Sequence, residues 1–439
     1  MTTVGQLSNQ VKHIWQQGSF QTELDDALHQ TLRHQALAGV KATLETALER
    51  ELDAHLGFAH HQQRTVGGKP PEQQRSGFFL RGLATEFGTI ADLRVPKLRA
   101  GNAARVWQVL TRHQSVWQSL LDKGLYLYGL GLSLRDLQEI FYLLFDNVLS
   151  VSAVNQVTLT AQAAMSRWRQ QPLADTPPIL LVDGVWVKIL YPTGETWTDQ
   201  SGHQRRTMRG QEQVLLAALG VWPDGRHYLL HYLPAKAEQP ESWAAFFQQL
   251  SARGLVASSV QLVVSDGSSG LLEALATALP HAQLQRCVVH KVRGMERYLS
   301  YSALPSHDSQ SGQALSESAA RLQRRQQIKA AALEIFDAPT QREAQQRLAA
   351  FEAHWTPLEP KAVHNFTWGI KRCFHFYQFP TQLHPLIRST NTLERFFREF
   401  RDKADEIGSF PNEASALTIF HLVMVREHAK HHRVAFVKT

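Results

Sequence analysis

Ile179-Leu-Leu-Val-Asp183-Gly184 opens the part of the sequence from which the fold can be predicted. Its four apolar residues indicate a buried strand that continues to Leu190, and Asp183 interrupts that strand with a carboxylate. A second apolar run that ends in an acid, Val260-Gln-Leu-Val-Val-Ser-Asp266-Gly267, follows later in the chain. We therefore expect a buried strand to hold each of the two carboxylates in place.

The segments between these runs predict a particular sheet. Strands Gln213–Trp222 and Arg226–Leu233, joined through Asp224-Gly225, form a hairpin beside the first strand, which gives three adjacent antiparallel strands. Helices and strands then alternate, and glycine or proline marks the helix ends: Glu241–Arg253 before Gly254, Val260–Ser265, Gly270–Leu279 before Pro280, and Ala282–Val289. This order is that of an RNase H-like sheet, in which the first and fourth strands are neighbours. Asp183 and Asp266 should therefore meet.

A third acid lies on a strongly two-sided helix, Arg388-Ser-Thr-Asn-Thr-Leu-Glu-Arg-Phe-Phe-Arg-Glu-Phe-Arg401. At helical spacing one side carries Leu393, Phe396, Phe397, Phe400 and Ala404, and the other carries Asn391, Glu394, Arg398, Arg401 and Asp405. A solvated polar face would explain this helix by itself. The two upstream aspartates favour a different interpretation, in which the helix packs on the sheet and Glu394 completes an acidic triad.

Three carboxylates around two divalent cations suit phosphodiester chemistry. One cation lowers the pKa of water or of a DNA 3′-hydroxyl, and the other stabilises the leaving oxygen. Hard oxygen ligands favour Mg²⁺, for which Mn²⁺ can substitute. We expect Asp183 to bridge the two cations, with Asp266 and Glu394 completing their coordination.

Several ordered motifs accompany the acids. They are Leu52-Asp-Ala-His-Leu-Gly57, Glu86-Phe-Gly88, Arg94-Val-Pro-Lys-Leu-Arg99, Gly131-Leu-Ser-Leu-Arg135, Asp183-Gly184, Ser265-Asp-Gly267, Gln285-Arg-Cys-Val-Val-His290, Ser389-Thr-Asn-Thr-Leu-Glu394 and Gly408-Ser-Phe-Pro411. With them the chain resembles the prokaryotic Mutator-type insertion-sequence transposases, a branch of the DDE transposases, over most of its length. The resemblance implies that Asp183, Asp266 and Glu394 are the catalytic, metal-binding triad. It also implies binding to terminal inverted repeats, strand cleavage and strand transfer.

The Cys287-Val-Val-His290 motif has three interpretations. The resemblance implies that it lies near the active site and helps to arrange DNA, although Arg293-Gly294 departs from the Arg-Asn that is common in the family. A buried cysteine beside a hydrogen-bonded core histidine is a structural alternative. A zinc site is a further alternative, for which the sequence lacks a convincing set of four ligands.

Further polar residues are candidates for DNA contacts. We expect Cys287, His290, Asn391, Arg395 and Arg398 to position DNA, and we expect base or phosphate contacts from Asn155, Gln156, Arg167, Arg205, Arg206, Arg209, Lys291 and Arg293. Each basic residue taken alone is more often a solvated surface charge, because an isolated exposed charge needs no partner. Asn155, Gln156 and Arg167 belong to a possible helix-turn-helix, in which Ser133 caps Leu134–Phe145 and Ser152 caps a helix that reaches Trp168. An ordinary pair of packed helices remains the alternative there.

The whole sequence predicts an α/β RNase H-like catalytic core with an inserted helical subdomain, preceded by a mainly helical DNA-binding region. The expected regions are a helical N-terminal region and linker (1–77), a DNA-binding region (78–175), the first part of the core (176–299), the helical insertion (300–380), and the rest of the core with the glutamate helix (381–439). A short β-rich stretch is expected at Thr85–Leu98, and helical sequence fills Ser316–Phe351.

Composition agrees with a DNA-binding protein. The 439 residues carry a formal net charge of +7, which favours a polyanionic partner, and two cysteines argue against a disulfide scaffold. We expect a cytoplasmic protein without membrane spans, associated with the nucleoid when bound to double-stranded DNA, and a homodimer or higher oligomer in a synaptic complex. A structure-specific nuclease of the same fold and a noncatalytic DNA-binding regulator derived from a transposase are the competing functions.

Overall fold

A computed structural model describes residues 23–59, 62, 74–99, 107–110, 114, 116–129, 132, 134–145, 151–302, 304 and 314–437. The chain separates into two compact units, Met1–Ala164 and Met165–Thr439, which are described separately. The break between them falls within one helix, α5 (Val151–Gln170). The five regions expected from the sequence stay predictions. No helix in the described part of the chain combines the length and the hydrophobicity that crossing a membrane would need.

The N-terminal unit contains α2 (Glu23–Leu56), a β1–β2 hairpin (Arg75–Thr85 and Gly88–Leu98), α3 (Gln118–Gly129), α4 (Leu134–Phe145) and the first part of α5. Leu48 of α2 packs against Leu83 and Leu93 of the hairpin, and Phe141 of α4 packs with Val157 of α5. The hairpin begins ten residues earlier than the predicted Thr85. Phe78, Phe79 and Leu80 are all substantially exposed, so alternation of buried and exposed residues does not mark the start of this strand.

The predicted helix pair is present as α4 and α5. Helix α5 already begins at Val151, so Ser152 lies in its first turn instead of preceding it as a cap. Ser133 and the side chain of Gln156 lie outside the described residues. The helices therefore occur where the sequence predicts them, and their use as a DNA-reading unit stays a prediction.

The C-terminal unit is built on a five-stranded mixed sheet with the order β5-β4-β3-β6-β7. Its strands are β3 (Ile179–Thr198), β4 (Gln204–Val221), β5 (His227–Ala235), β6 (Leu262–Ser265) and β7 (Gln283–Arg286). The first three are antiparallel, and β6 pairs in parallel with β3 through Ile179 opposite Leu262. The prediction that the first and fourth strands of this sheet are neighbours is therefore confirmed.

Helices cover both faces of this sheet. On one face, α6 (Pro240–Ala252) and α7 (Ser269–Ala278) bury Trp243 and Phe246 against alternate residues of β3 and β4 such as Val182 and Leu216. On the other face, α14 (Glu413–Val437) packs beside α13 (Asn391–Ile407). Successive residues of β5 point to opposite faces of the sheet. The ring of His231 lies 5.0 Å from that of Phe246 on α6, whereas the ring of Tyr232 lies 4.9 Å from that of Phe420 on α14.

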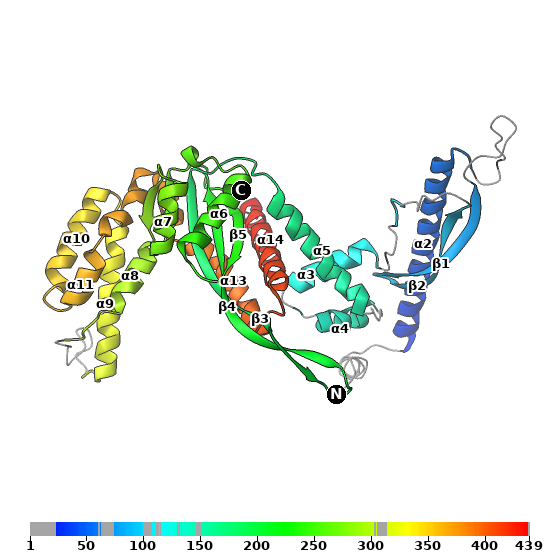
Figure 1. Ribbon diagram of the computed structural model, residues 1–439, viewed down its shortest axis with the longest axis horizontal. Helices are drawn as coiled ribbons and strands as arrows, with labels where there is room; N and C mark the ends of the chain where they lie inside the picture. Colours follow the sequence, from blue (N-terminus) through cyan, green and yellow to red (C-terminus); the bar gives the residue numbers. More distant parts are fainter. Residues whose placement is uncertain are drawn as a thin grey trace. The chain divides into compact units, whose positions relative to one another are not determined.

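Strands β3, β4 and β7 differ most from their predicted bounds. Strands β3 and β4 continue beyond Leu190 and before Gln213 as a paired arm, visible as the long green strands of Figure 1. Residues 192–198 are exposed, so no apolar alternation marks this arm in the sequence. Strand β7 is shorter than the expected Ala282–Val289, because Val288 already begins α8 (Val288–Glu296).

Helices fill the interval between β7 and α13. After α8 come α9 (Glu317–Phe336), α10 (Gln341–Trp355), α11 (Pro360–Thr367), three short 3₁₀ helices (Ile370–Cys373, His375–Gln378 and Thr381–Leu383) and α12 (His384–Ile387). The helical sequence predicted at Ser316–Phe351 is thus two helices, and Thr340 caps the second by accepting a hydrogen bond from Glu343 N. The aromatic residues around Cys373 pack as expected, with the ring of Phe374 5.6 Å from that of Phe336.

Candidate active site

Asp183 and Asp266 lie at the centre of the sheet, where the pairing between β3 and β6 ends. Asp183 sits within β3 opposite Ala217 of β4, but on the other side β6 pairs with β3 only through Val264 and ends at Ser265. Asp266 follows directly and accepts a hydrogen bond from Ser268 N at 2.9 Å, whereas Asp183 accepts one from Gly184 N at 2.8 Å. The strand order therefore brings both aspartates to one edge of β3.

Glu394 reaches the same place on α13. The apolar stripe predicted for this helix is confirmed, since Leu393, Phe396, Phe397 and Phe400 are buried. Both ends of α13 are tied down. Before it, Val288 N donates to Arg388 O at 3.0 Å, and after it, Phe410 pairs with β3 by donating to Lys188 O and accepting from Leu190 N. The helix can therefore hold Glu394 at a fixed position beside the sheet.

The charges of the three acids interact. Burial raises the pKa of Asp183 to about 6, and the charges of Asp266 and Glu394 add to this increase. The charge of His290 and the hydrogen bond from Gly184 act in the opposite direction. The pKa of Asp183 thus responds to the charges of Asp266 and Glu394, and the assignment of the three acids to one catalytic, metal-binding triad stays a prediction.

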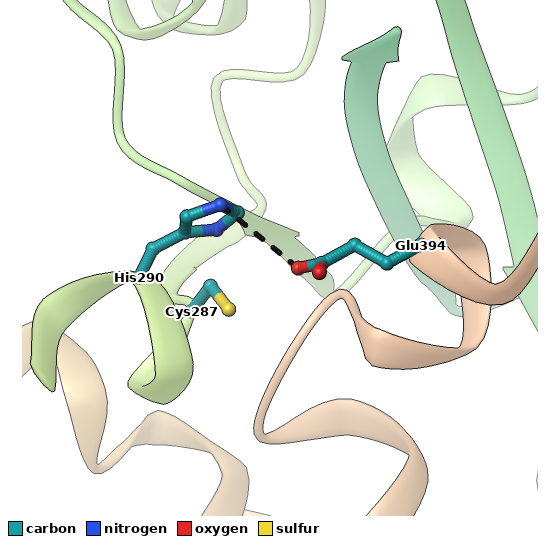
Figure 2. A group of neighbouring side chains, drawn as sticks. All are labelled: Cys287, His290 and Glu394. Carbon is teal, nitrogen blue, oxygen red and sulfur yellow. Dashed lines mark ion pairs between the residues drawn. The ribbon is translucent and has the colours of Figure 1, made fainter. Parts of the chain in front are cut away.

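His290 is the cationic neighbour of this group. Its Nε2 lies 3.9 Å from Glu394 Oε1, and Figure 2 shows the two side chains approaching from α8 and α13. A hydrogen bond with Cys287 and the charges of Asp183 and Glu394 raise the pKa of His290 to about 9, against the lowering effect of burial. The protonated imidazole therefore offsets part of the repulsion among the acids.

Cys287 is fully buried and organises the start of α13. Its sulfur accepts hydrogen bonds from Thr390 N at 3.4 Å and Thr390 Oγ1 at 3.5 Å, and Thr390 Oγ1 also donates to Glu394 Oε1 at 3.2 Å. One potential metal-binding atom each from Cys287, His290 and Glu394 lie within 4.8 Å of one another. Because the sulfur already accepts two hydrogen bonds and His290 is paired with Glu394, these contacts favour a positioning role over a zinc site.

One further acid, which the sequence did not single out, lies against this group. Glu238 is in the loop before α6, and a Cβ atom built on Gly184 would lie only 2.9 Å from Glu238 Oε1. Burial raises the pKa of Glu238 to about 7, and the charges of Asp266 and Asp183 add to the increase. No apolar run leads into Glu238, so the sequence pattern that revealed the two aspartates is absent here.

Most of the predicted DNA-contact residues have exposed side chains, whereas Lys291 is buried. Exposed side chains belong to Asn391, Arg395 and Arg398 on α13, Arg293 on α8, Arg205, Arg206 and Arg209 on β4, and Asn155 and Arg167 on α5. Arg205 is also paired with Asp199, whose Oδ2 it contacts at 2.8 Å. The exposed members remain available for contact with a polyanion.

Lys291 requires a correction. Only 2% of this residue is exposed, and its ammonium donates to the carbonyl oxygens of Asn365 and Trp368, both at 2.7 Å. Burial lowers the pKa of Lys291 to about 8. The side chain joins α8 to the end of α11, so we assign it to the interior instead of to a phosphate contact.

Comparisons with known proteins identify the family. Residues 14–310 and 314–434 match the family described as Transposase, Mutator family. The chain is 27% identical over 391 residues to the transposase for insertion sequence element ISRM5 of Rhizobium meliloti, a match that covers 89% of this chain and 86% of that protein. It is 28% identical over 397 residues to the transposase for IS1081 of Mycobacterium tuberculosis, which covers 89% and 84%, respectively.

A further relative is the transposase for IS256 in transposon Tn4001 of Staphylococcus aureus, 26% identical over 358 residues, with 81% of this chain and 82% of that protein covered. Among solved structures, the Drosophila P element transposase strand transfer complex shows a weak likeness, with a TM-score of 0.28 and 10% identity over 72% of this chain and 80% of that one, which does not establish a shared fold. The match along nearly the whole sequence does establish the family: the chain belongs to the Mutator family of transposases.

Proposed function

We propose that this protein is a DNA transposase that binds the terminal inverted repeats of an insertion sequence and performs metal-dependent strand cleavage and strand transfer. The observation that carries the proposal is the electrostatic convergence of Asp183, Asp266 and Glu394 within a chain of the Mutator family. The sheet order, with β6 beside β3, supports an RNase H-like core. The enzyme would then be of the DDE type.

The acids fit a divalent cation. Their carboxylate oxygens are the hard ligands that Mg²⁺ and Mn²⁺ prefer, and their mutual repulsion favours a cation among them. Asp183, Asp266 and Glu394 would hold it, and a bound cation would supply charge stabilisation at the phosphate under attack. Tethering of Glu394 through Thr390 and Cys287 would keep its carboxylate in position before DNA binds.

Basic residues beside the acids suit the DNA backbone. Arg395 and Arg398 lie on the exposed side of the helix that carries Glu394, and Arg293 is exposed on the helix that carries His290. Guanidinium groups at these positions would bind phosphates and align a strand with the acids. His290 would help to position the DNA end, because it is part-buried beside Glu394.

The partners follow from the same proposal. Double-stranded DNA is needed as both transposon end and target, and holding two ends together would require a homodimer or a higher oligomer. The α4–α5 helix pair, with exposed Asn155, is the proposed reader of the terminal repeats. The protein would act in the cytoplasm, on DNA of the nucleoid.

A strand-joining assay tests the proposed function. The full chain is incubated with DNA that carries the two ends of its own element and a target plasmid, with Mg²⁺. Asp183→Asn should bind the ends normally and lose both cleavage and joining, whereas Asp402→Asn, an exposed aspartate on α13, should behave like the wild type. Near-normal joining by Asp183→Asn would refute the proposal. Cleavage without joining would indicate a nuclease, and binding without metal-dependent chemistry would indicate a regulator.

A further inference from the structure

Glu238 is held in place by its backbone. It lies in the loop between β5 and α6, where the N-terminal turn of α7 packs directly on it. A Cβ atom built on Gly270 of α7 would lie 2.5 Å from Glu238 O and 3.1 Å from Gln239 C. A side chain at Gly270 would collide with backbone, so this glycine permits the close approach that fixes the loop.

The carboxyl of Glu238 is pressed against the strand that carries Asp183. A Cβ atom on Gly184 would lie 2.9 Å from Glu238 Oε1 and 3.2 Å from its Cδ. Gly184 directly follows Asp183, and the side chain of Trp186, two residues further on, hydrogen-bonds to the same carboxyl. The absence of a side chain at residue 184 therefore leaves room for an acid beside Asp183.

Neighbouring strand residues point to opposite faces, so Asp183 and Glu238 approach the strand from different sides. They still interact electrostatically, and Asp266 interacts with both. The reason is the end of β6 at Ser265, because within the described residues no strand pairs with that edge of β3 between Leu181 and Ile189, where Phe410 forms an isolated bridge. Side chains from both faces of the sheet can meet across this open edge.

Glu238 lacks the partners of an ordinary half-buried acid. Among the described residues no lysine or arginine forms an ion pair with it, and the charges that act on it are those of Asp266 and Asp183, which His290 offsets in part. The hydrogen bond from Trp186 does not by itself explain why Glu238 lies here. Trp186 is 47% exposed, so solvent can also supply an acceptor for its side chain. Placing a carboxylate beside two others is unfavourable unless a cation joins them.

We infer that Glu238 is a fourth acidic residue of the divalent-cation site, which helps Asp183 and Asp266 to hold a cation, directly or through a water molecule, on the α6 side of β3. This inference rests on the proposed function, because that function supplies the cation. Gly270 then fixes the backbone of Glu238, and Gly184 leaves room for the Glu238 side chain as well as for Val214, whose Cγ2 would lie 2.7 Å from a Cβ atom at residue 184.

Mn²⁺ binding to the full-length protein without DNA tests the inference. Free Mn²⁺ is measured by electron paramagnetic resonance as the protein is titrated, and circular dichroism confirms folding of each variant. Glu238→Gln should weaken Mn²⁺ binding about tenfold or more, the usual effect of losing a carboxylate at or next to a metal. Glu238→Asp should retain part of the affinity. Glu241→Gln, which removes an exposed acid three residues away on α6, should match the wild type.

Two further variants separate the possible failures. Trp186→Phe removes the hydrogen-bond donor and should leave Mn²⁺ affinity within about twofold, so an effect equal to that of Glu238→Gln would overturn the inference in favour of simple hydrogen bonding. If Asp183→Asn abolishes Mn²⁺ binding and Glu238→Gln does not change it, the inference fails and the proposed function stands. If neither variant changes Mn²⁺ binding, both fail.

Discussion

Both Glu359, in the helical segment, and Asp183, at the centre of the sheet, are acids removed from solvent. Their surroundings differ, because Glu359 is surrounded by hydrogen-bond donors and Asp183 by other acids. Glu359, 0% exposed, accepts hydrogen bonds from Ser300 N at 2.6 Å, Ser300 Oγ at 2.8 Å and Tyr301 N at 3.1 Å, and Arg324 lies 3.6 Å away. Asp183 instead lies near three other acids and His290.

The difference separates a structural acid from a proposed ligand-binding one. Every oxygen of Glu359 has donors from the protein itself, so the residue joins the loop after α8 to α9 and the start of α11 without any ligand. The acids around Asp183 remain mutually repelling in the protein alone. A site of this kind gains stability when a cation binds, whereas the Glu359 cluster is already complete.

The largest change in the free energy of unfolding is expected when Glu359 is removed from its contacts with Ser300, Tyr301 and Arg324. Glu359→Ala leaves the Arg324 guanidinium, 6% exposed, without its buried partner, and breaking such a pair costs about 3–5 kcal/mol. Urea unfolding, followed by a probe in the C-terminal unit, measures the change. Glu334→Gln, an exposed acid on α9, is the control and should change the free energy of unfolding by less than about 0.5 kcal/mol. Equal stability of the two variants would contradict this role of Glu359.

In metal-free protein, Asp183→Asn should increase the free energy of unfolding, whereas Glu359→Ala decreases it. Burial raises the pKa of Asp183 from 3.8 to about 6, so at neutral pH its charged form opposes folding, and removing the charge should stabilise the protein by roughly 3 kcal/mol. Unfolding in the presence of a chelator measures this gain. Added Mg²⁺ should stabilise the wild type and leave Asp183→Asn unchanged. A loss of metal-free stability in Asp183→Asn would contradict a destabilising charge at this buried position.

His231 is a third kind of buried ionisable group, one that stays neutral in the folded protein. Burial lowers its pKa to about 3, and the charges of Arg253 and Arg169 contribute, against a hydrogen bond that the imidazole donates to Gln249. The unfolded chain takes up a proton near pH 6.5 and the folded protein does not, so stability falls as pH decreases from 6.5 toward 3, by roughly 2 kcal/mol at pH 5.

The pH dependence of unfolding for His231→Gln checks this assignment. The variant should lose stability less steeply between pH 6.5 and 5 than the wild type does. His421 of α14, whose pKa burial lowers to about 4, contributes in the same direction and leaves a residual slope in the variant. Identical slopes in the variant and the wild type would rule out a neutral buried His231.

The smallest effect on stability is expected for an exposed charge. Arg398→Ala should change unfolding by less than about 0.5 kcal/mol, yet it should weaken binding to all DNA sequences and reduce the salt dependence of log K by about one unit per lost phosphate contact. Fluorescence anisotropy with labelled DNA at several salt concentrations measures this slope. Lys291→Met, which alters a buried lysine, should leave the slope unchanged, and a reduced slope there would contradict its assignment to the interior.

The sequence predicted the parts of the fold that bury apolar residues in a regular pattern. The neighbouring positions of β3 and β6, the end of α6 before Gly254 and the buried stripe of α13 all follow from hydrophobic periodicity and helix-ending residues. Asp183 and Asp266 could be found because apolar strands lead into them. Periodicity therefore located the elements and, with them, the acids attached to those elements.

Features outside that periodicity could not be predicted. The β3–β4 arm and the start of β1 are largely exposed, so their strands are stabilised by pairing and leave little hydrophobic pattern. The contact of Glu238 with Gly184 depends on tertiary packing between a loop and a strand 54 positions earlier, and the burial of Lys291 depends on carbonyl groups at the end of α11. Such contacts require the three-dimensional structure.

Iron-mediated cleavage of the protein chain tests the central claim most directly. Fe²⁺ bound in place of Mg²⁺, with ascorbate and peroxide, cuts the backbone close to the metal, and mass spectrometry locates the cuts. Convergence of the acids around a cation predicts cuts near residues 183, 266 and 394, all suppressed by excess Mg²⁺ and absent in Asp183→Asn. Cuts confined to other parts of the chain, or cuts that Mg²⁺ does not suppress, would contradict a shared cation site.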